Sequence, residues 1–129
     1  MGKTALDLTP DERRAYRPAE AIARRNSDQR ATIERRKERA WELARTAADR
    51  LRNDFGAQRV LVFGSLAHRS WFTQWSDIDL IAWGIAPERF YAAAAAVEEL
   101  DSSFRIDLLD PVTALPGMLE DIERVGVEV

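Results

Sequence analysis

The sequence contains no cysteine and only one histidine, His68, among its 129 residues. The absence of cysteine excludes a disulfide framework and any zinc site with thiolate ligands. A histidine-based zinc site would have at most one imidazole ligand, which is too few. Any metal ion that the chain binds must therefore be a hard cation held by oxygen atoms, such as Mg²⁺.

Long apolar segments are also missing. The longest apolar run, residues 91–97, is far too short to span a bilayer. Acidic residues precede any apolar run at the N-terminus, unlike a signal peptide, and Leu6 stands where a myristoylation signal has Ser or Thr. We therefore expect a cytoplasmic protein that does not bind membranes. Its composition, 46% hydrophobic and 32% charged, is that of an ordinary globular domain.

Charge is distributed unevenly along the chain. Residues 1–55 contain 14 Lys/Arg and 10 Asp/Glu, whereas residues 56–129 contain 5 and 12. The basic clusters Arg24-Arg25 and 35–39 are interleaved with glutamates at helical spacing. This pattern favours a solvated helix first and a protein partner second; direct nucleic-acid binding is possible but not favoured. We predict a helical N-terminal extension over 1–55, packing on the domain or on a partner, and a core over 56–129.

Helical signals dominate the first part of the chain. Residues 9–12 form a capping box, and Pro18 interrupts or restarts the helix that it opens. Residues 26–28, Asn-Ser-Asp, predict a break or a second cap. The longest helical pattern runs from about Gln29 to Phe55, with an apolar stripe in its second half.

Strand signals follow from residue 59 onward. Buried strands are predicted at 59–63, 77–83 and 104–109, with a helix over 87–100 between the second and third. From residue 111 onward, one or two short helices or turns are expected, with apolar positions including Met118 and Ile122 facing inward. The fold class is α/β (α+β), a small mixed sheet with helices packed on it.

Two motifs at the ends of these strands carry possible chemistry. Gly64-Ser65 directly follows the first strand, where glycine lets a polyanion approach the backbone and Ser65 offers a hydroxyl and an amide at a possible helix N-terminus. Asp77 and Asp79 are two residues apart, so on a strand both carboxylates share one face. Paired carboxylates repel each other unless a cation lies between them, which indicates a metal site.

A third carboxylate, Asp107, lies in the strand over 104–109. If that strand neighbours the Asp77–Asp79 strand, three carboxylates can hold two Mg²⁺ ions, with triphosphate oxygens completing the coordination. Alternatives remain for each residue. If the strand begins at Ile78, Asp77 is a turn or cap residue and Asp79 faces solvent on an edge strand. Asp107, taken singly, is an exposed residue of a two-faced sheet.

The spacing of these residues resembles a known superfamily. Gly64-Ser65, eleven residues and then Asp77-Ile78-Asp79 are similar to the Gly-Ser…Asp-x-Asp signature of DNA polymerase β-like nucleotidyltransferases. Within it, the segment 58–110 is most similar to the minimal nucleotidyltransferases, which are often antitoxins paired with HEPN-domain ribonuclease toxins.

The resemblance implies a role for each matched residue. Gly64 and Ser65 would bind the triphosphate, Asp77 and Asp79 would ligate both Mg²⁺ ions, and Asp107 would bind the catalytic ion and help to deprotonate the attacking hydroxyl. ATP is the implied substrate. The implied reaction transfers AMP to a tyrosine hydroxyl of the HEPN toxin and blocks its RNase activity. The polymerase β-like fold is implied with it.

The loop after Gly64-Ser65 departs from the family pattern. Members commonly have Ala-Arg-Gly where this chain has Ala67-His68-Arg69-Ser70, so Arg69 is the candidate for the missing phosphate contact. Two alternatives remain. One is a catalytically weak or inactive antitoxin that acts by binding. The other is a nucleotidyltransferase for a small molecule of the aminoglycoside type. Three aromatic residues later in the loop, Trp71, Phe72 and Trp75, are expected to pack against the domain rather than stack on a base.

Overall fold

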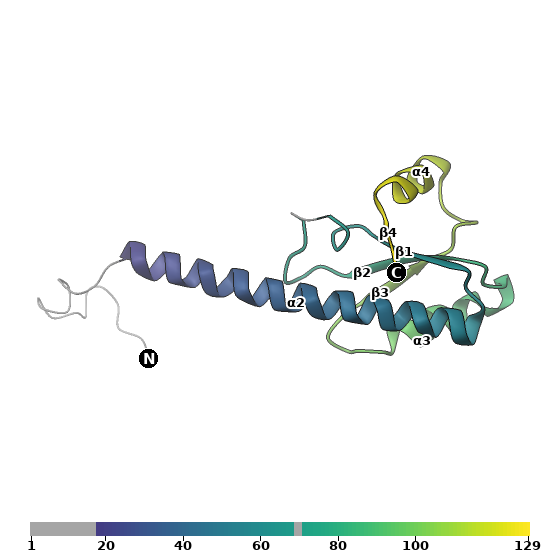
Figure 1. Ribbon diagram of the computed structural model, residues 1–129, viewed down its shortest axis with the longest axis horizontal. Coiled ribbons are helices and arrows are strands. Elements are labelled where there is room, and N and C mark those ends of the chain that lie inside the picture. The colour runs from purple at the N-terminus through teal and green to yellow at the C-terminus, as the bar shows by residue number, and fades with distance from the viewer. Residues whose placement is uncertain (1–17, 69–70) are drawn as a thin grey trace, which may run out of the picture. The chain divides into compact units, whose positions relative to one another are not determined.

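The computed structural model describes residues 18–68 and 71–129 (Figure 1). By its internal contacts the chain divides into two units between Thr32 and Ile33, and each unit is described by itself. The predicted capping box at residues 9–12 lies outside the described residues, as does Arg69.

In the first unit, the described residues belong to α2, which spans Pro18–Phe55 and continues into the second unit. Proline fits the first helical position because the amide that it lacks would have no intrahelical partner there. The predicted break at residues 26–28 is wrong, because all three residues are helical. At this point the Thr32 hydroxyl donates a hydrogen bond to the Asp28 carbonyl oxygen at 2.9 Å. The helix is largely exposed here, and even Ile22 is 56% exposed.

The second unit contains a four-stranded mixed sheet in the order β3-β2-β1-β4. Strands β1 (Arg59–Phe63) and β2 (Ile78–Trp83) are antiparallel, and β3 (Ile106–Leu109) runs parallel to β2. Strand β4 (Val127–Glu128), which the sequence pattern did not predict, pairs antiparallel with β1. The three predicted strands and the mixed sheet are thus confirmed.

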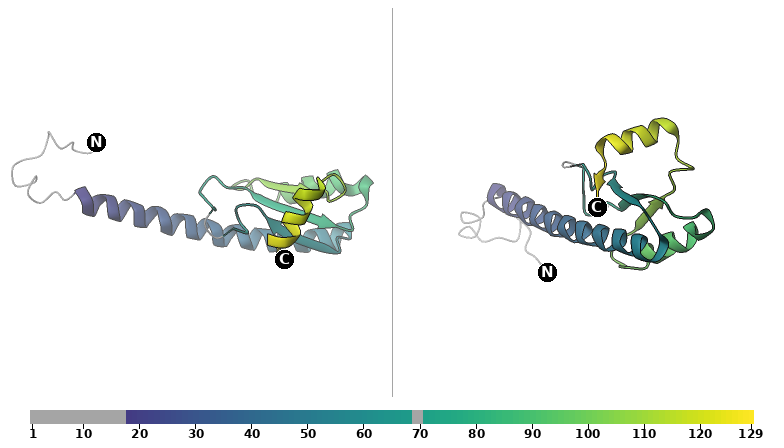
Figure 2. Two further views of the ribbon diagram at one scale, coloured as in Figure 1. Left: turned by 90° about the horizontal axis from the view of Figure 1, so that it is seen from above. Right: turned by 45° about the vertical axis from the view of Figure 1, so that its right-hand side comes forward.

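One face of this sheet is closed by helices. The second half of α2 and α3 (Phe90–Glu98), which follows a 3₁₀ turn at Pro87–Arg89, lie on the same side of the sheet (Figures 1 and 2). Every second residue of the strands points toward these two helices and packs against the apolar stripe of α2. The fully buried side chains here stabilise the fold by about 1.5–3 kcal/mol each. They include Leu51, Val60, Val62, Leu80 and Val97.

The opposite face is covered only in part. Helix α4 (Pro116–Val125) places Ile122 against Leu61 and Ile81, which form a small second core. Figure 2 shows α4 on the side of the sheet away from α2 and α3. The inward position predicted for Ile122 is confirmed, whereas Met118 is 43% exposed and its predicted burial is wrong.

The fold class is a small α/β (α+β) domain with a mixed sheet and a helical N-terminal region. Within residues 18–68 and 71–129, none of the helices has the length and apolarity needed to cross a membrane.

Candidate functional site

The carboxylates singled out from the sequence lie where the face under α4 is left uncovered. Alternation along β2 puts Asp79 on the same face as Ile81, away from the main core. In the parallel register Asp79 lies opposite Asp107 of β3, and in the antiparallel register it lies opposite Phe63 of β1. The two aspartates are therefore neighbours across the strands, as the sequence predicts if β2 and β3 are adjacent.

Asp77 completes this group from just outside the sheet. Strand β2 begins at Ile78, one residue later than predicted, so Asp77 precedes the strand instead of sharing its alternation. The Ile78 amide donates to the Arg105 carbonyl oxygen at 2.9 Å, which fixes the start of β2 against β3. We call Asp77, Asp79 and Asp107 the acid row. Since β2 is an interior strand, the alternative that placed Asp79 on a solvent-facing edge is wrong.

Burial and neighbouring charge both act on the Asp79 carboxylate. Partial burial raises the pKa of Asp79 above its ordinary value, and the negative charges of Asp107 and Asp77 raise it further. The positive charge of Arg105 acts in the opposite direction. A cation at the acid row would offset the repulsion between these charges, which makes the row a candidate metal or substrate site.

Gly64 forms one wall of the acid row. Its φ of 71° lies in the left-handed region, which favours glycine. A Cβ atom at this position would overlap the Asp79 carboxylate oxygen and lie 3.3 Å from Asp79 Cγ. The backbone at Gly64 therefore approaches the carboxylate more closely than any side-chain-bearing residue would permit.

Ser65 lies in a turn. Its carbonyl oxygen accepts a hydrogen bond from the His68 amide at 3.2 Å, and residues 64–67 are turn residues. The helix that the sequence allowed to start at Ser65 is not present in the part of this loop that the structure describes. Ser65 is half-buried and has no helix N-terminus behind it.

The donor set fits Mg²⁺ in chemistry, although it does not enclose the ion by itself. Among the described residues, no three carboxylate or imidazole groups converge into a metal site. Asp107 Oδ1 instead accepts a hydrogen bond from Arg105 Nε at 3.1 Å. Mg²⁺ is usually held by one or two carboxylates together with substrate phosphates and water. Asp79 with Asp77 or Asp107 provides such a partial set.

A cavity of about 290 Å³ opens beside Gly64, between the loop after β1 and the last turns of α4. His68 and Trp71 stack within its lining, with ring centroids 3.8 Å apart and planes 14° apart. The structure gives the lining as Gly64, Ala67, His68, Trp71, Asp121, Arg124 and Val125. A larger hollow of about 540 Å³ lies between α2 and α3, on the other face of the sheet, and none of the acid-row carboxylates lines it.

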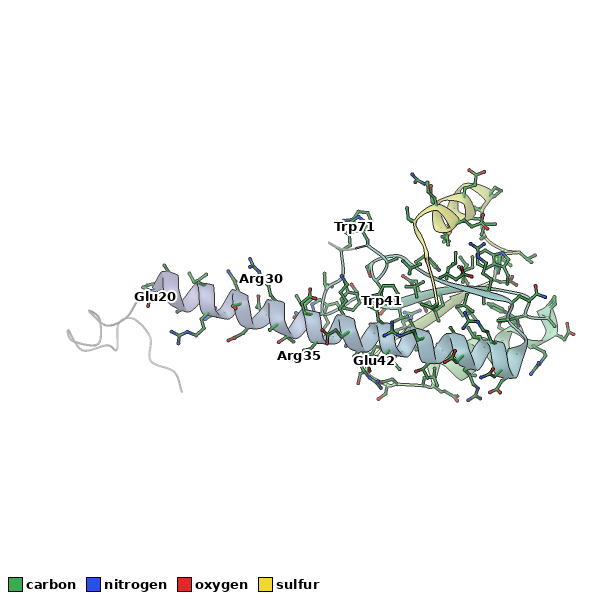
Figure 3. All side chains as sticks on the ribbon, in the orientation of Figure 1. Glu20, Arg30, Arg35, Trp41, Glu42 and Trp71 are labelled. Atoms are coloured by element: carbon green, nitrogen blue, oxygen red, sulfur yellow. The ribbon has the colours of Figure 1, made fainter. Side chains whose placement is uncertain are left out.

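The sequence misjudged the aromatic residues of this loop. Phe72 packs in the core as predicted, but Trp71 is 65% exposed and Trp75 is 82% exposed, so their predicted packing is wrong. Figure 3 shows Trp71 on the loop that follows β1. The α4 residues Asp121, Arg124 and Val125 were not anticipated, because no motif marks them. The available signal in the sequence was the presence of two tryptophans shortly after the candidate phosphate loop.

Part of the basic cluster at residues 35–39 has a structural role. The Arg36 guanidinium donates to the Ser103 carbonyl oxygen at 3.2 Å and lies 4.0 Å from the Phe104 ring centroid. Arg39 pairs with Asp101 at 3.2 Å. These contacts fasten α2 to the segment before β3. The structural interpretation of this cluster therefore has direct support at these two positions.

No model of a known protein family matches this chain, and no characterised protein matches its sequence significantly. What the chain does must therefore be inferred from the chemistry of its own residues.

Proposed function

We propose that this protein is a Mg²⁺-dependent nucleotidyltransferase that transfers AMP from ATP to a hydroxyl group of a partner protein. The proposed acceptor is a tyrosine of a cognate HEPN-domain ribonuclease toxin, which makes this chain an antitoxin acting in the cytoplasm. The enzyme class draws support from the site geometry, and the partner draws support from the motif resemblance alone.

One observation carries the enzymatic proposal. Asp79 lies beside Asp107 in register on adjacent strands, and the left-handed Gly64 closes against the Asp79 carboxylate. Neighbouring carboxylates on an interior strand are unfavourable without a cation, as the raised pKa of Asp79 indicates. Because Gly64 has no side chain, the backbone of the Gly64-Ser65 turn lies directly beside the carboxylate that would hold the cations. Metal ions and a triphosphate together satisfy both features.

In the proposed reaction, the acceptor oxygen bonds to the α-phosphorus of ATP while the bond from that phosphorus to the bridging oxygen of pyrophosphate breaks. Pyrophosphate leaves with that electron pair, and the acceptor proton passes to a carboxylate oxygen of Asp107. Asp77, Asp79 and Asp107 would hold the two Mg²⁺ ions. Bound Mg²⁺ would supply charge neutralisation on the phosphates and activation of the hydroxyl. Gly64 and Ser65 would orient the triphosphate from the wall of the site.

The experiment that tests this proposal is a transfer assay with α-labelled ATP, Mg²⁺ and the protein encoded by the neighbouring gene. The Asp77→Asn/Asp79→Asn double variant should lose at least about 100-fold in labelling rate, since it removes most of the negative charge that holds the cations. Asp110→Asn is the matched control. It is an aspartate just past β3, and its variant keeps the oxygen that accepts the Val112 amide at 3.0 Å.

Labelling of the partner that is lost in the double variant and retained in Asp110→Asn supports both the reaction and the acceptor class. Absence of labelling, combined with Mg²⁺-independent or undetectable ATP binding in calorimetry, contradicts the enzymatic proposal. Labelling that the double variant retains would place the active site elsewhere.

A specific contact favours one other candidate, an antitoxin that acts by binding without catalysis. Arg105 already provides a positive charge to Asp107 at 3.1 Å, where a catalytic metal would otherwise act. If this ion pair replaces the metal, the chain should form a stable complex with its partner and block RNase activity equally well with and without ATP. An ATP requirement for inhibition would exclude this candidate.

A further inference from the structure

The cavity beside Gly64 shares a wall with the acid row. Gly64 contacts the Asp79 carboxylate and also lines the cavity of about 290 Å³. A ligand whose charged part lies on the acid row can therefore extend directly into the cavity. Cavities that bind small organic ligands begin at roughly 300 Å³, so the space suits a group of nucleoside size.

The lining of this cavity combines aromatic, apolar and polar groups. Trp71 stacks on His68 and still exposes 65% of its surface, and Val125 on α4 is 57% exposed. Exposed aromatic and apolar surface of this kind is costly in water and favourable for stacking a heterocyclic base. Asp121 and Arg124, paired at 3.1 Å, add an acceptor and donors at the rim. This is the usual composition of a small-molecule site, apolar walls with a few polar groups.

We infer that this cavity binds the nucleoside part of the triphosphate substrate, with the base against the His68–Trp71 pair and α4 forming the opposite wall. This inference rests on the proposed function, because it takes the triphosphate to lie on the acid row. It goes further by assigning substrate recognition to residues of α4 and to a tryptophan that no motif identifies.

Calorimetry with three probes separates the two halves of the site. The probes are adenosine, which reports on the cavity; Mg²⁺-tripolyphosphate, which reports on the acid row; and Mg²⁺-α,β-methylene-ATP, which spans both and resists cleavage. Trp71→Ala should weaken adenosine and the ATP analogue by about tenfold and leave tripolyphosphate unchanged. Trp71→Phe should restore most of the lost affinity, because it keeps an aromatic face.

Trp75→Ala is the matched control. Trp75 lies in the same loop and is 82% exposed, but it does not line the cavity, so this variant should bind all three probes like the wild type. Arg124→Ala tests the opposite wall and should weaken only the probes that contain a nucleoside. The side chains of Trp75 and Arg124 are both exposed, and thermal melting would verify that the variants fold.

The two proposals fail in different ways. If Trp71→Ala and Arg124→Ala leave the affinity for the ATP analogue unchanged, or if Trp71→Ala weakens tripolyphosphate equally, the nucleoside assignment is overturned. If Asp79→Asn leaves the affinity for tripolyphosphate unchanged, the proposed function is contradicted. Trp71-dependent adenosine binding together with Asp79-dependent tripolyphosphate binding supports both.

Discussion

The two faces of the sheet differ in what covers them. The face toward α2 and α3 is apolar along its whole length, and Leu80 and Val62 are completely buried there. The face toward α4 is apolar only around Leu61 and Ile81 and then changes to the acid row. Adjacent residues of the same strand, such as Asp79 and Leu80, thus belong to opposite environments.

This difference shows how a small domain can hold unfavourable charge. The closed face provides the hydrophobic stabilisation that fixes the strand register, and register alone brings Asp79 beside Asp107. The open face contributes less to stability and carries the groups available for chemistry. Substitutions on the two faces should therefore have separable effects, the first on folding and the second on ligand and proton binding.

The largest effect is expected on the closed face. Leu80→Ala should lower the free energy of unfolding by about 2–5 kcal/mol, because Leu80 is completely buried and its removal leaves a cavity in the core. Urea denaturation followed by circular dichroism measures this change. Leu109→Ala, at a half-buried position on the open face, should cost less than about half as much. Equal losses would contradict the distinction between the faces.

The next largest effect concerns the glycine that meets the acid row. Gly64→Ala should destabilise the protein by at least about 2 kcal/mol, because it combines a left-handed backbone with overlap of the Asp79 carboxylate. Gly56→Ala is the matched control. Gly56 has nearly the same φ, 73°, but no atom lies within 4 Å of the added Cβ, so about 1 kcal/mol is expected. If thermal melting shows equal destabilisation by Gly64→Ala and Gly56→Ala, the close approach of the Gly64 backbone to Asp79 is contradicted.

A smaller effect is expected from Asp79→Asn, and it depends on pH. Because the folded-state pKa of Asp79 is raised, the folded protein holds this proton more tightly than the unfolded chain. Wild-type stability should therefore decrease as pH rises from the ordinary carboxylate pKa of 3.8 through the raised value. Asp79→Asn should lose this decrease and be more stable at neutral pH, by less than about 1 kcal/mol after solvent screening.

Melting temperatures measured from pH 4 to 8, with and without Mg²⁺, would test this expectation. Mg²⁺ should stabilise the wild type at neutral pH and have little effect on Asp79→Asn. An identical pH profile for the two proteins would show that the Asp79 charge costs the fold nothing.

The smallest effect is expected from Arg105→Ala. Arg105 lowers the pKa of Asp79 and pairs with Asp107 on the surface, so its removal should raise the pKa of Asp79 further. Nuclear magnetic resonance titration of the carboxyl carbons would detect the shift. The exposed ion pair itself should contribute no more than about 1 kcal/mol. A lowered pKa of Asp79 in this variant would show that Arg105 acts through structure and not through its charge.

Much of the fold could be predicted from periodicity. Strands β1, β2 and β3 read as short apolar segments, and the apolar stripe of α2 marked its packed half. The adjacency of Asp79 and Asp107 could be stated only conditionally, because strand order is a long-range property that a local pattern does not contain.

What sequence reasoning missed has specific physical causes. Strand β4 has only two residues, too few to show alternation. Residues 26–28 favour caps in isolation, but a long helix tolerates them. The exposure of Trp71 and Trp75 contradicts their hydrophobicity, since burial depends on neighbours that residue type does not reveal. The cavity lining joins residues of a loop and of α4 that are far apart in the chain.

The parallel pairing of β2 and β3 has a consequence for the synthesis and folding of the protein. Parallel neighbours cannot be joined by a tight turn, so the chain must leave the sheet, form α3 and return before Asp107 meets Asp79. During synthesis, a ribosome-bound chain that ends before β3 therefore carries Asp77 and Asp79 but lacks Asp107. Long-range pairings of this kind form late in folding. Asp107 therefore joins Asp77 and Asp79 only when the pairing of β2 with β3 is complete, so the full acid row forms late in folding.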